Sequence, residues 1–265
     1  MESNGLTLHS YSLGDGVVAF STTRHGGYPA ADNYNSFNIN PFCGDSAEHV
    51  AQCRKALCRE LGIADERLVL PHQVHGVETR IISAEYCSLP EQVRTMIVDG
   101  VDAVMTAVPG LCIGVSTADC VPVLLHDPVH RAVCAVHAGW RGTLARVTHK
   151  AVVDMRAAFG TAPADLHAVV GPCISLANFE VGDEVYEQFA AADFNLDAAS
   201  VRREKWHIDL PEINRQLLVQ AGLDEANIAM SGICTYDRCD DFFSARRLGI
   251  ESGRIFNGVM LSTDC

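Results

Sequence analysis

The sequence lacks any uninterrupted apolar run of the roughly 18 residues that a membrane-spanning helix requires. Its first residues also lack a basic segment followed by an apolar one, which is the pattern of a secretory signal peptide. Neither a membrane partner nor an export route is therefore indicated. We expect a cytoplasmic protein that does not bind membranes.

Basic side chains are scarce in this chain. It has 20 lysines and arginines against 33 aspartates and glutamates, which gives a formal net charge of −13. A strongly acidic protein repels polyphosphate backbones, so we expect no nucleic-acid partner. A small anion is still compatible with this charge, because a few arginines can hold a phosphate locally.

The chain also lacks internal repeats, low-complexity tracts and linkers rich in glycine, serine and proline. Its 11 cysteines are scattered without regular spacing, so they do not indicate a disulfide framework. Most of these thiols are expected to be free and buried, as in a reducing cytoplasm. We therefore expect one domain that spans residues 1–265.

Apolar runs and amphipathic segments alternate along the sequence. Apolar runs predict strands over residues 17–21, 68–70, 78–82, 111–115, 121–125, 132–136, 166–170, 228–233 and 255–261. Helices are predicted over residues 45–61, 143–159, 183–192 and 210–221. This interleaving predicts the α+β (mixed α/β) class, with a mixed β-sheet core and flanking helices in a single domain.

Two reactive side chains lie at the ends of predicted strands. Cys120 follows the strand over 111–115, directly after an aspartate, and His137 follows the strand over 132–136. A thiolate and an imidazole delivered by neighbouring strands fit a metal site. They fit equally well a cysteine nucleophile with a histidine as its base. The spacing alone does not choose between these two kinds of site.

A pair of histidines, His72 and His75, lies between a proline and a glycine that disfavour a helix there. In an extended segment their side chains point to opposite faces, so we expect one of them to point inward. Together with Cys120 and His137, one histidine of the pair would complete a set of three protein ligands. Three protein ligands are typical of a catalytic zinc site that keeps a fourth position open.

Arginines are the candidate groups for binding an anion. Arg24, Arg141 and Arg246 lie beside glycine or small residues, in segments that we expect to be loops. The planar guanidinium group suits bidentate capture of phosphate or carboxylate.

A set of motifs follows the same order as in a known family. They are Ser-Thr-Thr-Arg-His-Gly-Gly (21–27), Gln-Val-His-Gly (73–76), Asp-Gly-Val-Asp-Ala (99–103), Thr-Ala-Asp-Cys-Val-Pro (117–122), Val-His-Ala-Gly-Trp-Arg-Gly (136–142), Gly-Pro-Cys-Ile (171–174), Cys-Thr-Tyr (234–236) and Phe-Ser-Ala-Arg-Arg (243–247). Over residues 17–261 the chain thereby resembles the laccase-domain family, also called the multicopper polyphenol oxidase-like or peptidoglycan editing factor family.

The resemblance implies a metal site instead of a cysteine nucleophile. The family's His, Cys, His triad falls on His75, Cys120 and His137. Zinc suits two imidazoles and one thiolate, and copper also suits such donors. A multicopper oxidase needs many more paired histidines than this chain has, so we expect zinc and no laccase chemistry.

The resemblance also implies an enzyme that acts on small molecules. Members of the family are purine nucleoside phosphorylases that cleave adenosine, inosine and methylthioadenosine with phosphate, giving the free base and ribose 1-phosphate. They also have adenosine deaminase activity. The residues implied as catalytic are His75, Cys120, His137 and Arg246, and those implied to bind substrate or phosphate are Arg24, Arg141 and Arg246. The sequence identifies neither a proton shuttle nor an oligomeric state.

Two other functions stay open under the same resemblance. Bacterial members are linked to peptidoglycan editing, in which serine-containing muramyl precursors are removed by an amide hydrolysis that activated water could serve. The second alternative is a regulatory protein that binds a structural metal. Closed structural sites normally have four protein ligands, which argues against this alternative.

Overall fold

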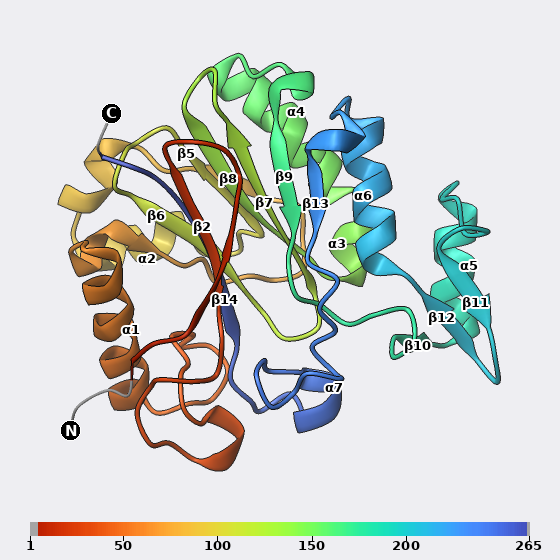
Figure 1. Cartoon of the computed structure of the whole chain (residues 1–265), viewed down its shortest axis with the longest axis horizontal. Helices are drawn as coiled ribbons and strands as arrows, with labels where there is room; N and C mark the ends of the chain where they lie inside the picture. The colour runs from red at the N-terminus through yellow and green to blue at the C-terminus, as the bar shows by residue number, and fades with distance from the viewer. Residues whose placement is uncertain (1–4, 264–265) are drawn as a thin grey trace.

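The computed structural model of the chain describes residues 5–263. Two large β-sheets occupy the centre of the molecule, and helices cover their outer faces (Figure 1). Strands and helices interleave along the chain, so the mixed, single-domain class predicted from the sequence is confirmed. No helix within the described residues is long and apolar enough to cross a membrane.

The first sheet has five strands in the order β1-β2-β14-β6-β3. Their bounds are Leu8–Tyr11 for β1, Val17–Thr22 for β2, Ile255–Leu261 for β14, Cys112–Thr117 for β6 and Leu68–Val69 for β3. All neighbours are antiparallel except β3 and β6, which are parallel. The last strand of the chain therefore lies in the middle of this sheet.

The second sheet has six strands in the order β13-β9-β7-β8-β5-β4. Their bounds are Ile228–Met230 for β13, His167–Val170 for β9, Val121–Asp127 for β7, Ala132–Ala138 for β8, Ala103–Thr106 for β5 and Thr79–Ile81 for β4. The outer pairs β13–β9 and β4–β5 are parallel, and the others are antiparallel. Both large sheets are therefore mixed.

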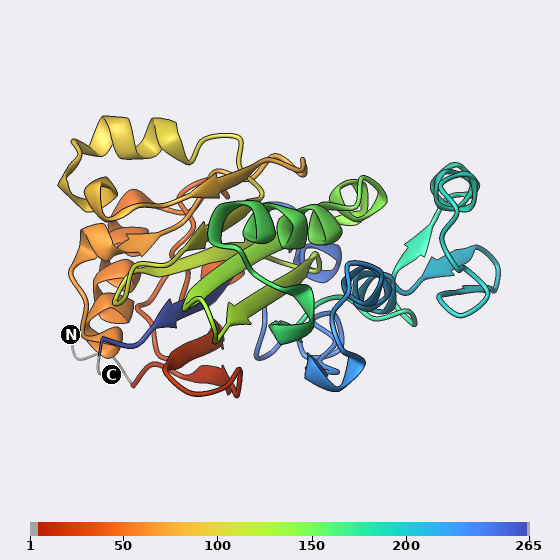
Figure 2. The ribbon, with the colours of Figure 1, turned by 90° about the horizontal axis from the view of Figure 1, so that it is seen from above.

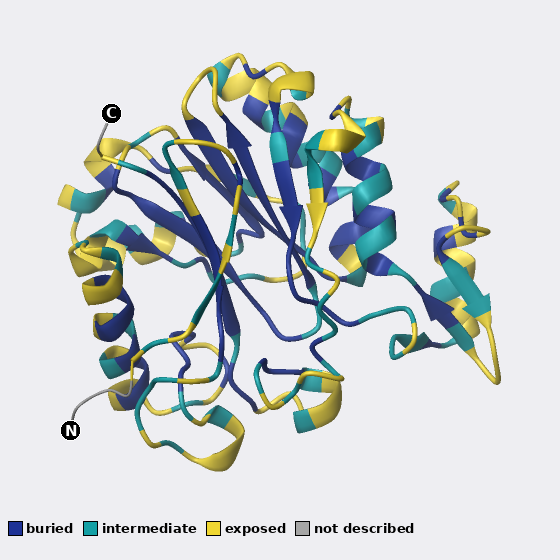
Figure 3. Ribbon diagram, viewed as in Figure 1, coloured by how far each residue is buried: buried dark blue, intermediate teal, exposed yellow. Residues whose placement is uncertain are grey.

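The two sheets pack against each other through one apolar core. This core joins Ile113 and Val115 of β6 to Leu124 of β7 and to Val133 and Ala135 of β8. Strands β5 to β8 are buried along their whole length (Figure 3). Strands buried on both faces have continuous apolar sequences, which is why β6, β7 and β8 could be predicted from the sequence.

Helices complete the layers on the two outer faces. Helix α1 (Ala47–Leu61) packs on the first sheet, and α4 (Val147–Phe159) and α6 (Leu210–Gln220) pack on the second. The side chain of Ser46 caps the start of α1, and Gly62 ends it with a φ of 65°. Such a left-handed residue favours glycine because a Cβ atom is strained there.

One predicted helix was wrong in its extent. The segment 143–159 forms the last part of α3 (Trp140–Leu144) and then α4. Arg146 lies between them with a φ of 61°, which interrupts the helical backbone. Its guanidinium group lies over the ring of Phe194 and donates to the carbonyl of Ala192, so the break is fixed by tertiary contacts.

Several short elements were not predicted. Three strands, β10 (Glu180–Val181), β11 (Ser200–Arg202) and β12 (Trp206–Ile208), form a small sheet beside α5 (Asp183–Ala191), a helix that was predicted. This part extends from the body as an arm (Figure 2). The other unpredicted elements are β1, β5, α2 (Glu91–Ile97), α7 (Ala245–Leu248) and the 3₁₀ turns at Asp32–Tyr34, Asp65–Arg67, Ala84–Ser88, Pro163–Asp165 and Glu225–Asn227.

Two glycines on neighbouring strands leave room for aromatic rings in the first sheet. Gly114 of β6 pairs with Gly258 of β14, and a Cβ atom at position 114 would lie 2.3 Å from Cζ of Phe256. We predict that Gly114→Ala lowers the free energy of unfolding by about 1–3 kcal/mol, since the fully buried ring has little space to move. Urea unfolding at equilibrium measures the change.

The control for this prediction is Gly5→Ala. No described atom lies within 4 Å of a Cβ atom built at Gly5, so the variant is expected to stay within about 0.5 kcal/mol of the wild type. Equal unfolding midpoints for Gly114→Ala and Gly5→Ala would contradict this prediction. They would show that β6 and β14 can move apart at Gly114 at little cost in free energy.

Candidate metal centre

Three side chains from three different parts of the chain meet at one point. His75 lies in the loop between β3 and β4, Cys120 in the turn between β6 and β7, and His137 in β8. One donor atom from each lies within 4.8 Å of the other two. The Sγ atom of Cys120 is 3.9 Å from Nε2 of His75, and the two imidazole centroids are 4.8 Å apart. The structure thus brings together the three residues that the motifs suggested.

The side chain of Gln73 holds the loop that carries His75. Its Oε1 accepts the backbone N–H of Ser116 at 2.7 Å, and its Nε2 donates to the carbonyl of Ser116 at 2.8 Å. Strand β3 pairs with β6 only as far as Val69, so the Gln73 amide continues this pairing beyond the end of the strand. His75 therefore has a fixed position relative to β6.

The carboxylate of Asp102 joins the His75 loop to His137. Its Oδ1 lies 2.7 Å from Nδ1 of His137 and accepts the N–H of His75 at 3.0 Å. Its Oδ2 accepts the N–H groups of Gly76 and Val74 at 2.7 and 3.2 Å. Because Nδ1 of His137 is engaged, Nε2 is the atom left to bind a metal.

Asp102 is fully buried, yet its contacts favour the charged form. Burial alone would raise the pKa of this carboxyl group, but His137 and the backbone N–H groups hold it below its usual value. The sequence interpretation quoted Asp102 only as part of a motif and assigned it no role. Its signal was an acidic residue directly before a run of apolar residues, where an unpaired charge would be costly.

Cys120 is positioned by the residue before it. Asp119 has a φ of 87°, an uncommon conformation for a residue other than glycine. Its Oδ1 accepts the hydroxyl of Thr235 at 2.7 Å, and its Oδ2 accepts the N–H of Arg246 at 2.7 Å. These contacts hold the turn between β6 and β7, and with it the direction of the Cys120 side chain.

The electrostatics of the site favour a thiolate. Burial alone would raise the pKa of Cys120, but the adjacent imidazoles of His137 and His75 lower it to about 6. Burial would likewise lower the pKa of His137, whereas the Cys120 sulfur and the Asp102 carboxylate raise it to about 9. A thiolate is the form of cysteine that binds metal ions.

The donor set therefore fits a metal ion. Two imidazoles and a thiolate are ligands that transition metals such as zinc and copper take. Within residues 5–263, these three residues form the one group of three or more histidine, cysteine or acidic side chains that are close enough to share an ion. With three protein ligands, a fourth position stays open for a substrate or for water.

The three donors line a cavity of about 300 Å³. Its other lining residues are Asn40, Phe42, Cys43, His72, Gln73, Ser116, Thr117, Ala118, Ala245, Ile250 and Arg254. His72 thus lies at the same cavity as His75, with its Nδ1 paired to Asp99 at 2.8 Å. A separate cavity of about 460 Å³ lies between β13 and the start of α6 and is lined by other residues.

The three arginines suggested by the sequence do not line this cavity. Arg24 lies in a loop as predicted, and it donates to the carbonyl of Cys239 at 2.7 Å. Arg141 and Arg246 were expected in loops, but they lie in the short helices α3 and α7. Arg141 lies over the neighbouring tryptophan ring, and Arg246 donates to the carbonyl of Glu180 at 3.2 Å. The arginine at the cavity is Arg254, which the sequence interpretation missed.

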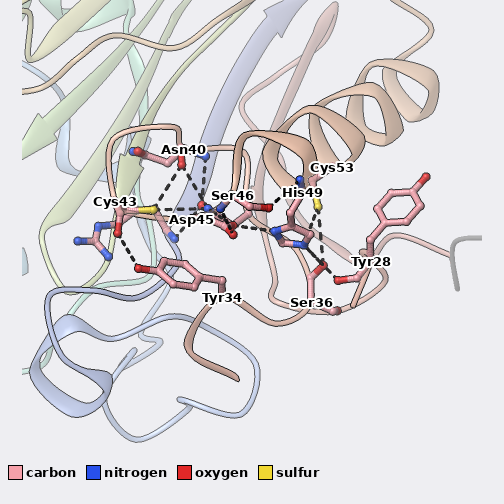
Figure 4. A network of polar contacts seen from close by, with 11 residues as sticks. Tyr28, Tyr34, Ser36, Asn40, Cys43, Asp45, Ser46, His49 and Cys53 are labelled. Atoms are coloured by element: carbon pink, nitrogen blue, oxygen red, sulfur yellow. Dashed lines mark hydrogen bonds and ion pairs between the residues drawn. The ribbon is translucent and has the colours of Figure 1, made fainter. Parts of the chain in front are cut away.

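A buried polar network supports the cavity from the side of α1 (Figure 4). Nδ1 of His49 lies 2.7 Å from Oδ2 of Asp45, and its Nε2 lies 3.2 Å from the carbonyl of Ser36. Burial alone would lower the pKa of His49, but its contacts with Cys53, Asp45 and a backbone carbonyl raise it to about 9. A charged histidine therefore ties the loop before α1 to the helix.

The fold and these donors define a mixed α/β protein with a three-ligand metal-type site at the junction of two sheets. The chain belongs to the multi-copper polyphenol oxidoreductase laccase family, whose model matches residues 18–262. Among solved structures, it is similar to the Bacillus licheniformis hypothetical protein YfiH, with a TM-score of 0.85 and 30% identity over 93% of each chain.

Two curated relatives cover almost the whole chain. A purine nucleoside phosphorylase of Bacteroides thetaiotaomicron is 45% identical over 258 residues, which are 96% of this chain and 94% of the relative. The adenosine deaminase RL5 of an unknown prokaryotic organism is 43% identical over 248 residues, which are 92% and 94% of the two chains. Relatives this similar over their full length are enzymes, and so is this protein.

The role of Asp102 can be tested with zinc as the probe. We predict that Asp102→Asn lowers the affinity for zinc by about 10- to 100-fold, because an amide cannot accept from all the groups that the carboxylate accepts from. Competition with a chromophoric chelator measures this affinity. The matched control is Asp127→Asn, which removes a buried carboxylate paired with His130 on the same sheet and should leave zinc affinity unchanged. Equal affinities for both variants would contradict the role of Asp102.

The His49 network predicts a pH dependence of stability. The pKa of His49 is raised from 6.5 to about 9, so its contribution is complete below about pH 6.5 and is lost as the pH rises towards 9. The difference in unfolding free energy between wild type and His49→Gln should therefore shrink over this interval. Urea unfolding at several pH values measures it.

His126 provides a control in which the contribution to stability should change with pH in the opposite direction. This buried histidine has a lowered pKa because burial disfavours its charged form. Its neutral form stabilises the fold, and this contribution is lost as the pH falls below about 6.5. The difference for His126→Gln should therefore shrink towards acid. A difference for His49→Gln that is constant from pH 6 to 9 would mean that folding does not raise the pKa of His49.

Proposed function

We propose that the protein is a zinc-dependent purine nucleoside phosphorylase that cleaves adenosine, inosine and methylthioadenosine with phosphate, and that it also deaminates adenosine. The observation that carries this proposal is the meeting of His75, Cys120 and His137 at one cavity. The names of the two relatives supply the reaction class, because one is a purine nucleoside phosphorylase and the other an adenosine deaminase.

Zinc is the metal that the donor set favours. Catalytic zinc sites commonly combine three protein ligands with one open position, and this set offers two imidazoles and a thiolate. Laccase chemistry with several coppers requires several clusters of ligands, whereas residues 5–263 offer one such group. When bound, zinc would supply Lewis-acid polarisation of an oxygen atom in the cavity.

In phosphorolysis, a phosphate oxygen forms a bond to C1′ of the ribose while the bond from C1′ to the purine nitrogen breaks. The electron pair of the broken bond goes to the base, which takes up a proton as it leaves. His72 is suited to deliver that proton from Nε2, because it lines the cavity and its Nδ1 is held by Asp99. The ring of Phe42, which also lines the cavity and is half exposed, offers a face for the purine.

Product analysis tests the proposal. Zinc-loaded protein incubated with adenosine should give adenine and ribose 1-phosphate only when phosphate is present, and inosine with or without it. We predict that Cys120→Ala loses both zinc and all products, since the thiolate is one of three ligands. Chromatography of the products and metal analysis of the protein provide the two readouts.

His72→Ala is the comparison variant. It should keep its zinc, because His72 lies outside the triad, but its phosphorolysis should be slower by about 10²- to 10⁴-fold without the proton donor. Loss of zinc from His72→Ala, with zinc retained by Cys120→Ala, would overturn the assignment of the ligands. Adenosine left intact by the zinc-loaded wild type would overturn the nucleoside activity itself.

A further inference from the structure

The cavity of the triad is lined by an arginine and a serine that are not among the three candidate metal ligands. Arg254 and Ser116 both line it. Ser116 is 5% exposed, and its Oγ has no hydrogen-bond partner among residues 5–263. A buried hydroxyl without a partner is costly, and the Oγ of Ser116 is itself covered, so it can donate to a ligand in the cavity once the side chain turns about χ1.

The strand register places the two residues at the same end of the first sheet. In the antiparallel pair of β14 and β6, Phe256 lies opposite Ser116. Arg254 is the residue directly before β14, so it lies close to this pair, at the end of the sheet where the triad lies.

The guanidinium group of Arg254 is held in place and keeps donor capacity. Its Nη1 donates to the carbonyls of Ser252 and Gly253, and its Nη2 donates to the carbonyl of Ile250 at 2.9 Å. Its Nε has no hydrogen-bond partner within the described part of the chain. The carbonyls orient the group, while Nε–H and the second hydrogen of Nη2 stay free to donate to an anion.

The backbone of Arg254 is anchored to the network of Figure 4. Oδ1 of the fully buried Asn38 accepts the N–H of Arg254 at 3.1 Å. Nδ2 of Asn38 donates to Asp45 at 2.8 Å, and Asp45 pairs with His49 of α1. Arg254 is thus fixed at both its backbone and its guanidinium group, as a preorganised binding group should be.

We propose that Arg254 and Ser116 form the phosphate subsite of this enzyme, a conclusion that rests on the proposed phosphorylase activity. The free N–H donors of Arg254 bind oxygens of the phosphate dianion through charge-assisted bonds, and the Ser116 hydroxyl donates to another oxygen. Arg24 and Arg246, which the sequence suggested for this role, donate to backbone carbonyls and do not line the cavity.

Phosphate kinetics and direct phosphate binding test the subsite. In Arg254→Gln, we expect the KM for phosphate in adenosine phosphorolysis to rise by about tenfold or more, because the variant lacks the cation. Phosphate-independent deamination of adenosine should fall by a clearly smaller factor than phosphorolysis. Arg254→Lys should fall between wild type and Arg254→Gln, because it keeps the charge and loses the planar fork.

Ser116→Ala separates a binding role from a structural one. Its hydroxyl has no partner among the described residues, so its removal should leave the unfolding midpoint unchanged or slightly higher. The KM for phosphate should nevertheless rise, by about three- to tenfold. The matched control is Arg67→Gln, whose guanidinium group also donates to two loop carbonyls but lies outside the cavity and should leave this KM unchanged.

Equilibrium dialysis with radiolabelled inorganic phosphate supplies a readout that does not depend on turnover. Weaker binding by Arg254→Gln and Ser116→Ala than by Arg67→Gln supports the subsite, even if the wild type forms no phosphorolysis product. Equal binding by all three variants overturns it. The subsite is also wrong if phosphorolysis and deamination fall by the same factor in Arg254→Gln, which is the result expected from structural damage.

Discussion

A buried negative charge is stable only when its oxygen atoms are well provided with donors, and Asp102 meets this condition within the protein. Its two oxygens accept three backbone N–H groups of the His75 loop and face the imidazole of His137. The need to satisfy this carboxylate therefore fixes two of the three candidate metal ligands relative to each other. Cys120 is placed separately, through Asp119.

The position of the site follows from the path of the chain between its two sheets. Strand β6 belongs to the first sheet and β7 to the second, so the turn that contains Cys120 crosses from one to the other. His137 approaches from the second sheet, and Gln73 binds the His75 loop to the first. The site is consequently supported by both sheets, and motion of either sheet relative to the other would separate the ligands.

The sequence predicted most of the central strands and the grouping of His75, Cys120 and His137, for two different reasons. Strands such as β7 and β8 are buried on both faces, so their apolar runs are long and continuous. The triad was assigned through motifs, whereas spacing alone left open both the choice between His72 and His75 and the choice between a metal and a nucleophile. Local pattern contains no information on which distant segments converge.

The less successful predictions involve residues whose surroundings come from distant segments. Arg146 interrupts a helical pattern because Phe194 and its neighbours hold it in another conformation. The motif around Arg246 suggested that this residue binds phosphate. In the structure, α7 directs its side chain to the arm, where it donates to the carbonyl of Glu180. The residues around Arg254 match none of the motifs, and Arg254 reaches the cavity because β14 pairs with β6.

The Gln73 amide forms two hydrogen bonds with the backbone of Ser116, as a neighbouring strand would, and these bonds limit how the loop can vary in length. One residue, Val74, separates this anchor from His75, and its side chain is 54% exposed. The chemistry at position 74 is therefore under little constraint, but the length of the segment is strongly constrained. An insertion or deletion here would shift His75 by a residue's length while its anchor stayed in place. Relatives that keep the anchor and the ligand can differ freely in the residue between them, but not in the number of residues.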